Sequence, residues 1–305
     1  MIWGEIILVY TITLNPSLDY IMGVGTLEFG EVNRSDYEKI QVGGKGINVS
    51  AVLKELGVES TALGFAAGFT GTKISADIEH MGIKSDFIFL SEGTSRINVK
   101  LKSDTETDIN GNGPQVSENE LEKLLDKLKA LKKGDVLVAS GSATKNAGAD
   151  IYERIVGAVS GKGVTLIVDT TGDFLISTLK YSPFMVKPNL FELRQLYGQD
   201  ITSDDEIISA ARSLIDMGAQ NVIVSMDARG ALLVNRSEAV KCAAKKGKVI
   251  NSTGAGDSLI AGFVYKYLES GSIHEAFDFG VFAGTAAAFS EGLATRAGID
   301  ACMEL

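Results

Sequence analysis

The segment 251–258 combines a glycine turn with an acidic residue at the start of an apolar helical run. It reads Asn-Ser-Thr-Gly-Ala-Gly-Asp-Ser. At a positive helix end, the N–H groups of Gly254, Ala255 and Gly256 can form a nest that stabilises developing negative charge. Asp257 falls in the first helical turn, where the macrodipole favours a carboxylate that can accept a proton from a hydroxyl. Phosphoryl transfer requires such a pairing of base and anion hole, whereas an ordinary helix cap explains Asp257 but not the glycines.

A second glycine cluster lies at 42–48, ahead of another amphipathic helix. It reads Val-Gly-Gly-Lys-Gly-Ile-Asn. Glycines there let backbone N–H groups approach a polar or anionic ligand closely, and Lys45 adds a point charge. The cluster is not a P-loop, because Gly46 rather than Ser or Thr follows the lysine. A plain turn into a helix is the alternative interpretation.

Two further clusters follow short strand-like runs in the second half of the chain. In 187–192, Lys-Pro-Asn-Leu-Phe-Glu, the oxygens of Asn189 and Glu192 could hold water around Mg²⁺ from one helix face. A capping box explains the same spacing equally well.

In 225–230, Ser-Met-Asp-Ala-Arg-Gly, Ser225 and the following amides could face nucleotide phosphates beyond the carboxyl end of a strand. On local grounds a β-turn is the simpler reading of that cluster.

The elements that must position these clusters alternate between β-rich and amphipathic segments. This rhythm predicts a parallel sheet covered by helices on both faces. Strands are expected at 6–13, 60–65, 136–139, 164–169, 184–186 and 221–225, and helices at 48–56, 72–81, 118–131, 149–160, 190–197 and 204–217, followed by a hairpin-like segment at 230–240 and helices from Gly256 and His274.

Two stretches, 19–42 and 96–109, break this rhythm. In the second, apolar and polar residues alternate from Ile97 to Lys102, which predicts exposed antiparallel strands without helices between them. Paired together, the two stretches would form a small accessory sheet, which we interpret as a lid. We therefore expect one domain spanning 1–305 with the lid strands inserted in it.

Composition narrows the class of protein. The chain has 305 residues and 45% hydrophobic residues, as expected for a globule with a substantial core. Its 29 Lys and Arg against 39 Asp and Glu give a formal net charge of −10, which repels nucleic acid and anionic membranes. No apolar run approaches the ~20 residues of a membrane helix, and Cys242 and Cys302 lack disulfide or zinc spacing. We expect a cytoplasmic protein with no nucleic-acid or membrane partner.

Taken in order, the segment Asn15-Pro16-Ser17-Leu18-Asp19 and the four clusters resemble the ribokinase-like (PfkB) sugar kinases over nearly the whole chain. The segment 95–101, Ser-Arg-Ile-Asn-Val-Lys-Leu, is similar to the branch that phosphorylates fructose 1-phosphate or tagatose 6-phosphate. The resemblance implies a three-layer α/β fold with a mostly parallel central sheet flanked by helices and a small β-sheet lid. It also implies MgATP-dependent phosphorylation of a sugar phosphate.

The resemblance also implies a role for each site residue. Asp257 would be the base, with Gly254, Ala255 and Gly256 as the anion hole. The sugar hydroxyls would be held by Asp19, Gly44 and Asn48, and the phosphate already on the sugar by Lys45 and Arg96. Asn189 and Glu192 would hold Mg²⁺ through water. The ATP phosphates would be lined by Lys187, Ser225, Met226, Asp227, Ala228, Arg229, Gly230 and Gly256.

The leading hypothesis is therefore the phosphorylation of fructose 1-phosphate at its C6 hydroxyl, with a tagatose-6-phosphate kinase as the alternative. Two departures from the family pattern motivate a third reading, a catalytically weak sugar-phosphate sensor. Asp227 stands where the family usually has glycine, and 141–146, Gly-Ser-Ala-Thr-Lys-Asn, replaces Gly-Ser-Leu-Pro-x-Gly. The chain has no Gly-x-Gly-x-x-Gly segment after its first expected strand, which argues against a dinucleotide-dependent oxidoreductase. Exposed edges of the lid strands indicate a homodimer formed through the lid.

Overall fold

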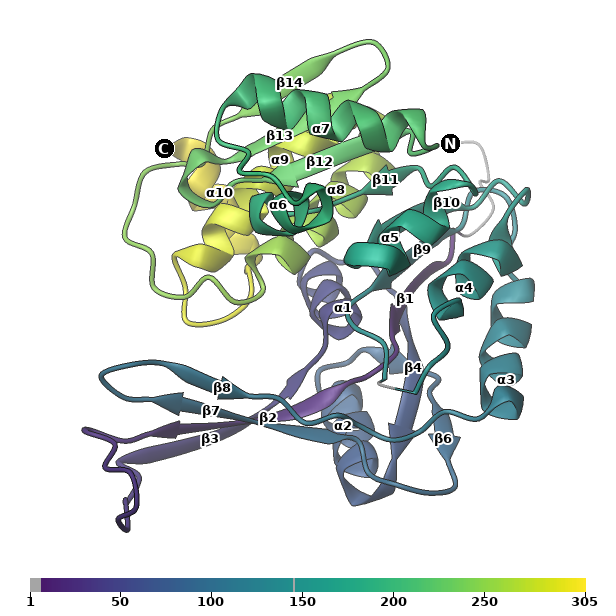
Figure 1. Ribbon diagram of the computed structural model, residues 1–305. Coiled ribbons are helices and arrows are strands. Elements are labelled where there is room, and N and C mark those ends of the chain that lie inside the picture. Colours follow the sequence, from purple (N-terminus) through teal and green to yellow (C-terminus); the bar gives the residue numbers. More distant parts are fainter. Residues whose placement is uncertain (1–6, 145) are drawn as a thin grey trace.

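A mostly parallel sheet forms the centre of the molecule (Figure 1). The computed structural model describes residues 7–144 and 146–305, so Ile6 of the first expected strand and Lys145 of the 141–146 loop lie outside it. The strands are β1 (Val9–Thr13), β4 (Thr61–Ala67), β5 (Lys84–Ser85), β6 (Ile88–Leu90), β9 (Val136–Ser140), β10 (Thr165–Asp169), β11 (Met185–Val186), β12 (Asn221–Ser225), β13 (Ala231–Asn235) and β14 (Ala239–Cys242). Their order is β14-β13-β12-β11-β10-β9-β1-β4-β5, with β6 also paired to β4, and the hairpin of β13 and β14 is antiparallel.

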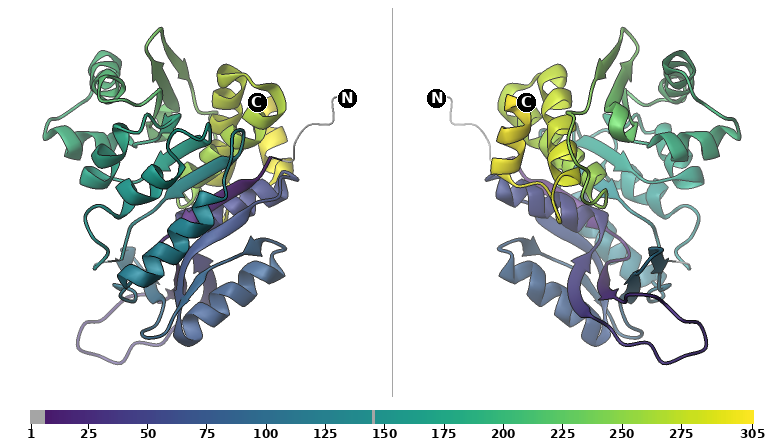
Figure 2. Two further views of the ribbon diagram at one scale, coloured as in Figure 1. Left: turned by 90° about the vertical axis from the view of Figure 1, so that its right-hand side faces the viewer. Right: turned by 90° about the vertical axis from the view of Figure 1, so that its left-hand side faces the viewer.

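Helices cover both faces of this sheet, as Figure 2 shows from two sides. One layer packs through α1 (Lys45–Glu55), α8 (Ala255–Ser270), α9 (Ile273–Ala288) and α10 (Arg296–Glu304), and the other through α3 (Glu118–Lys129), α4 (Ile151–Val159), α5 (Gly172–Leu179), α6 (Leu190–Tyr197) and α7 (Asp204–Asp216). The helix α2 (Gly68–His80) packs on β4 and the base of the smaller sheet. No helix in the described ranges is long and apolar enough to cross a membrane.

The strands divide their side chains between two cores. In β9, Leu137 packs with Ile12 and Leu124 on one face, whereas Val136 and Val138 pack into the cluster on the other face. Successive residues of a strand point to opposite faces, so a strand covered on both sides is apolar throughout. This is why the expected strands are short continuous apolar runs, and the fold class predicted from the sequence is confirmed.

The smaller sheet projects from the body of the molecule (Figure 1). It consists of β2 (Ser17–Gly23), β3 (Tyr37–Gly43), β7 (Arg96–Lys102) and β8 (Thr107–Ile109), in the order β3-β2-β7-β8. Each outer strand pairs antiparallel with its neighbour, but β2 and β7 pair in parallel. The expectation of purely antiparallel pairing is wrong at this seam, because β2 and β7 each begin at the body and run outward together. The small sheet is confirmed, and its action as a lid stays a prediction.

The largest boundary differences are at helices, and the largest of these is at α2, which begins at Gly68, four residues earlier than expected. The helix α1 begins at Lys45, three residues earlier than expected, because Gly44 already caps it. A side chain at Gly46 would meet the Ile12 carbonyl oxygen at 2.5 Å, so glycine lets the first turn lie directly on β1. The helices α5 and α10 are not predicted, because both are short and neither has a clear apolar stripe. The helix α5 contains Gly and Thr, and α10 contains Gly and Cys.

Candidate active site

The glycine turn at the start of α8 has the geometry of an anion site. Gly254 caps the helix at a φ of 81°, a left-handed conformation that favours glycine. The N–H of Ala255 lies 3.3 Å from the Ser252 carbonyl oxygen, whereas the N–H groups of Gly254 and Gly256 have no partner among the described residues. Free amides at a helix N-terminus attract anions. The N–H of Gly256 is therefore better placed to bind an anion than that of Ala255, which already has a partner.

Asp257 lies beside these amides with only 6% of its surface exposed. Its Oδ2 accepts a hydrogen bond of 2.7 Å from Nδ2 of Asn48. Burial, followed by the charge of Asp169, raises the pKa of Asp257 to about 6. Asn48, Lys45 and Lys187 act against this rise in pKa. The carboxylate is therefore ionised at neutral pH yet basic enough to take a proton from a reacting hydroxyl.

The buried charge predicts that Asp257→Asn stabilises the protein at neutral pH. The pKa is 3.8 in the unfolded chain and about 6 in the folded protein, so ionisation reduces stability as the pH rises through that window. At about 1.4 kcal/mol per unit, the cost above the window is about 3 kcal/mol. Calorimetry should show a higher melting temperature for the variant at pH 7.5 but not at pH 4. Equal melting temperatures at pH 7.5 would contradict the assigned burial cost.

Asp169, which the sequence analysis missed, stands next to the base. It ends β10, is 1% exposed, and lies 3.2 Å from Nζ of Lys45 and 3.4 Å from Nζ of Lys187. Burial alone would raise its pKa, but Lys187 and then Lys45 outweigh burial and lower it. Neither of its oxygens has a contact with hydrogen-bond geometry. The available signal was an acidic residue at the carboxyl end of a buried strand, where ligands of parallel sheets bind.

Lys45 lies among the residues of the base and the predicted metal site. Its Nζ is 3.2 Å from Asp169 and 4.0 Å from Oε1 of Glu192. Burial would lower its pKa, but the carboxylates of Asp169, Asp257 and Glu192 together raise it. The lysine is therefore a fixed positive charge at the centre of the site, rather than part of the lid that carries Arg96.

The lid contributes a polar face built by strand register. Asp19 on β2 is opposite Asn98 on β7, whose Nδ2 donates to Asp19 Oδ1 at 2.8 Å. Lys100 lies 3.9 Å from Oδ2 of the same carboxylate. Arg96 donates through Nε to the carbonyl oxygen of Asn15 at 3.0 Å. Asn98 and Lys100 belong to the 95–101 motif but have no predicted role of their own, although their period-two spacing with Arg96 places all three on one face.

The remaining clusters meet at the carboxyl ends of β11 and β12. The N–H of Ser225 donates to the carbonyl oxygen of Pro188 at 3.2 Å, and Asn189 forms a bridge with Ser225. Lys187 is 4% exposed, and its Nζ lies 3.0 Å from where a Cβ on Gly256 would stand. The structure thus brings Lys187, Asn189 and Ser225 together and connects them to the anion site.

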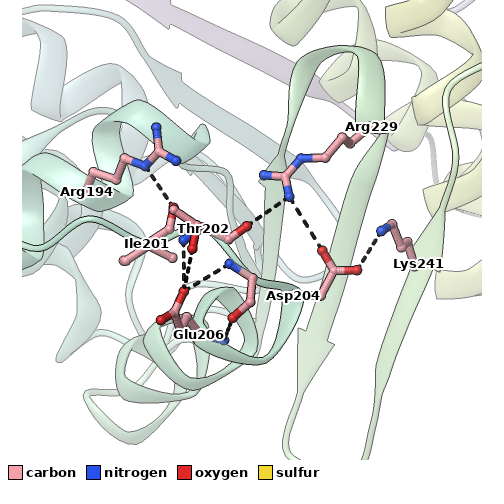
Figure 3. Close-up of polar contacts among 8 residues, drawn as sticks. Arg194, Ile201, Thr202, Asp204, Glu206, Arg229 and Lys241 are labelled. Carbon is pink, nitrogen blue, oxygen red and sulfur yellow. Dashed lines mark hydrogen bonds and ion pairs between the residues drawn. The ribbon is translucent and has the colours of Figure 1, made fainter.

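The turn after Ser225 is anchored to the connection between α6 and α7 (Figure 3). Its short 3₁₀ helix, η1 (Asp227–Arg229), presents Arg229, which donates to the carbonyl oxygen of Thr202 at 3.1 Å and lies 3.7 Å from Asp204. Lys241 donates to the other oxygen of Asp204 at 2.5 Å. Arg229 is therefore engaged with Thr202 and Asp204, and it forms no ion pair with Asp227 in the part of the chain that the structure describes.

Asp227 has a φ of 52°, in the left-handed region that accounts for glycine in the family pattern. Because its exposed carboxylate lies in the turn predicted to line the ATP phosphates, Asp227→Asn should lower KM for MgATP. An exposed charge contributes up to ~1 kcal/mol, which corresponds to about two- to fivefold. Steady-state kinetics with Asp216→Asn as the control tests this, since Asp216 is an exposed carboxylate at the end of α7. An unchanged KM in Asp227→Asn would place the carboxylate outside the field of the phosphates.

The predicted magnesium residues form the capping box that was the alternative interpretation. Glu192 Oε2 accepts from the N–H of Asn189 at 2.8 Å, and Asn189 Oδ1 accepts from the N–H of Glu192 at 2.8 Å. Within the described ranges no three His, Cys, Asp or Glu side chains are grouped to hold a metal directly. Glu192 Oε1 and both oxygens of Asp169 accept no hydrogen bond among the described residues, although Lys45 and Lys187 lie beside Asp169. Such oxygens fit an ion that keeps most of its own waters.

The chain matches the model of the pfkB family carbohydrate kinases over residues 7–299. It is 41% identical over 289 residues to the 1-phosphofructokinase of Bacillus subtilis, covering 95% of each chain. It is 36% identical to the D-tagatose-1-phosphate kinase of Bacillus licheniformis, covering 96% of each chain. It is also 34% identical to the tagatose-6-phosphate kinase of Staphylococcus epidermidis, covering 89% of this chain and 87% of that one.

Solved structures agree with these relatives. Phosphofructokinase-2 from Escherichia coli in complex with substrates and products superposes with a TM-score of 0.90 at 27% identity, covering 98% of this chain and 99% of that one. Ribokinase of Arabidopsis thaliana, with a TM-score of 0.81 and 19% identity over 99% of this chain and 100% of that one, shares the fold. The chain belongs to the pfkB family of carbohydrate kinases, which confirms the predicted family. It is accordingly an enzyme that phosphorylates a carbohydrate.

Proposed function

We propose that this kinase transfers the γ-phosphoryl group of ATP to the C6 hydroxyl of D-fructose 1-phosphate. The observation that carries the proposal is the juxtaposition of Asp257 with the free amides of α8, between the polar face of the lid and the Lys187 cluster. The identity to a relative named 1-phosphofructokinase supports this substrate. The buried carboxylate of Asp257 is a competent base, which argues against a binding-only sensor.

In the proposed reaction, Asp257 takes the proton of the C6 hydroxyl. The electron pair of that oxygen forms a bond to the γ-phosphorus while the bond from the γ-phosphorus to the bridging oxygen of ATP breaks. The electron pair of the broken bond leaves with ADP. The free amides of Gly254 and Gly256 stabilise charge on the transferred group, because they are oriented before the reaction begins, whereas the N–H of Ala255 already donates to Ser252.

The sugar phosphate is assigned to the lid side of the site. Asp19 Oδ2 can accept a hydrogen bond from a sugar hydroxyl, since Oδ1 already accepts hydrogen bonds from Ser17 and Asn98. Gly44, the cap of α1, and Asn48 complete the predicted hydroxyl contacts. Arg96 holds the phosphate already on the sugar through its terminal nitrogens, which have no partner among the described residues, while Nε is fixed to the backbone.

ATP is assigned to the opposite side, over Lys187 and the turn from Ser225 through Met226, Asp227, Ala228 and Arg229 to Gly230. Bound Mg²⁺ would shield the phosphate charges, with its waters held by Glu192 Oε1, Asn189 and Asp169. Lys45 is assigned to the transferred phosphoryl group, because its Nζ lies between Asp169 and Glu192. This assignment revises the prediction that Lys45 binds the phosphate already on the sugar.

A tagatose phosphate is the second candidate substrate, favoured by the two relatives named for tagatose phosphates. The decisive experiment measures initial rates of ADP release from MgATP in parallel with fructose 1-phosphate, fructose 6-phosphate, tagatose 1-phosphate and tagatose 6-phosphate. The proposal predicts the highest kcat/KM for fructose 1-phosphate. A higher value for a tagatose phosphate keeps the mechanism and changes the substrate, and turnover of none of them contradicts the proposed function.

We also propose that two copies associate through the apolar face of the lid, in the cytoplasm. Register places Ile40, Tyr20, Val99 and Ile109 in one row on the face opposite Asp19. Ile40 is 56% and Ile109 58% exposed, and no described element covers them. The face of the sheet, rather than its strand edges, is thus the surface that a second copy would cover. Phosphofructokinase-2 of Escherichia coli has a tetrameric form.

Ile40→Asp should convert the protein from a dimer to a single chain, because a buried unpaired carboxylate opposes association. Light scattering after size exclusion measures the mass of each variant. Met217→Asp, an equally apolar-to-acidic change at the exposed end of α7, is the control and should leave the dimer intact. A mass of one chain for the unaltered protein at working concentration would end this proposal.

A further inference from the structure

Asn48 makes a contact that binding of a sugar hydroxyl does not require. Its Nδ2 donates to Oδ2 of Asp257 at 2.7 Å, a hydrogen bond between α1 and α8 across 209 residues of sequence. The hydrogen bond joins the starts of two helices, each beginning at a glycine cap, Gly44 for α1 and Gly254 for α8. The contact therefore reaches the oxygen of the residue assigned as the base.

The support for Asn48 is rigid. The N–H of Asn48 donates to the Gly44 carbonyl oxygen at 2.9 Å in the first turn of α1. The next residues of α1, Val49, Val52 and Leu53, are fully buried in the same apolar cluster as α8. Because packed helices hold their side chains in few arrangements, the amide of Asn48 is held at one place relative to Asp257.

The hydrogen bond makes the two oxygens of Asp257 unequal. Oδ2 accepts the hydrogen bond from the amide, whereas Oδ1 has no hydrogen-bond partner among the residues that the structure describes. Turning the carboxyl group about its Cβ–Cγ bond would break the contact with Asn48. We propose that Asn48 is a positioning residue that fixes the carboxylate of Asp257 with Oδ1 toward the acceptor hydroxyl and stabilises its charged form.

The charges around Asp257 come from several elements. Asp169 at the end of β10 repels the charged carboxylate, while Lys45 of α1 and Lys187 after β11 attract it. Burial is the largest influence and raises the pKa of Asp257 to about 6, and the hydrogen bond from Asn48 is among the influences that lower it. The two lysines also pair with Asp169, whereas the amide of Asn48 is a neutral group that donates directly to the Asp257 carboxylate.

This inference rests on the proposed function, in which Asp257 is the base, and it predicts a pH effect that sugar binding alone does not. A side chain that only holds a sugar hydroxyl changes KM at every pH. A side chain that stabilises the ionised base also moves the acid limb of the pH profile, because kcat/KM falls when the base becomes protonated. We compare the position of the acid limb between variants, because the charge of bound ATP affects the acid limb of every variant alike.

The test measures kcat/KM for fructose 1-phosphate at saturating MgATP between pH 5 and 9 for Asn48→Ala and Asn48→Asp. A hydrogen bond to a charged group corresponds to about one pKa unit or more, so Asn48→Ala should move the acid limb up by about that much. Above the limb its kcat should fall about 10- to 100-fold from lost orientation. Asn48→Asp keeps the shape and places a second carboxylate there, which should move the limb further.

The lid supplies a matched control. Asn98 makes the same kind of contact with Asp19, through Nδ2 to Oδ1 at 2.8 Å, but does not touch the base. Asn98→Ala should raise KM for the sugar phosphate and leave the acid limb where it is. Circular dichroism of each variant checks folding, and Asn48→Asp carries the test if Asn48→Ala does not fold.

The outcomes separate this inference from the proposed function. An unshifted acid limb in folded Asn48→Asp or Asn48→Ala, with only KM raised, overturns the inference and leaves the proposed function intact. The same shift in Asn98→Ala also overturns it, because the effect would then not depend on contact with Asp257. Absence of turnover in the unaltered protein overturns the proposed function first.

Discussion

Asp257→Asn should fold, bind ATP and sugar phosphate, and lose about 10²- to 10⁴-fold in kcat, the usual contribution of a positioned base. The substitution removes the proton acceptor while keeping the shape of the side chain. The amides of Gly254 and Gly256 belong to the backbone and stay in place, so KM for either substrate should change much less than kcat. Initial rates of ADP release with fructose 1-phosphate measure the loss.

The expected rise in melting temperature of Asp257→Asn serves as an internal control. A variant that is more stable at neutral pH and still binds both substrates cannot owe its low turnover to unfolding. Near-normal turnover in a folded Asp257→Asn protein would remove Asp257 from the role of base. A loss confined to KM would instead assign the carboxylate to substrate binding.

Lys45→Met should give the second-largest effect, a fall of about 10²- to 10³-fold in kcat, as is typical for loss of one group that stabilises transition-state charge. Lys45 lies between Asp169, Glu192 and the base, where the γ-phosphoryl group would pass during transfer. The variant should fold, because the side chain of Lys45 is 36% exposed and Asp169 retains its pair with Lys187. Steady-state kinetics with each substrate varied in turn measures kcat and both KM values.

Arg96→Met is the matched comparison for Lys45→Met, because both changes replace a long cation by a neutral side chain. Arg96 is anchored on the lid by Asn15 and should contribute mainly to KM for the sugar phosphate. The opposite pattern, with Lys45→Met raising that KM and leaving kcat intact, would return Lys45 to the phosphate already on the sugar.

The sequence predicted most of the fold because its strands are continuous apolar runs between turn signals. The helix α6 and the strand β12 begin and end where the pattern places them. The parallel seam between β2 and β7 was not predictable from alternation, since a period of two is the same for either direction of pairing. The direction follows from where each strand leaves the body of the molecule.

For the site, local motifs predicted the glycine turns and the base, whereas charge partners were not predictable. Asp169 carries no motif of its own, and its meaning arises only when β10 brings it between Lys45 and Lys187. The family resemblance implies that Asn48 binds a sugar hydroxyl. Its hydrogen bond to Asp257, 209 positions away, cannot be predicted from sequence spacing. Asn189 and Glu192 supported two interpretations, and the capping box that they form accounts for part of their pattern.

Transfer of phosphate to one particular hydroxyl is tested most directly by identifying the product. Fructose 1-phosphate, MgATP and the unaltered enzyme are followed by ³¹P NMR, with Asp257→Asn in a parallel sample. We expect fructose 1,6-bisphosphate and ADP to appear in equal amounts, and almost none of either with Asp257→Asn. Unchanged fructose 1-phosphate, release of inorganic phosphate alone, or a sugar phosphorylated at a hydroxyl other than C6 would contradict it.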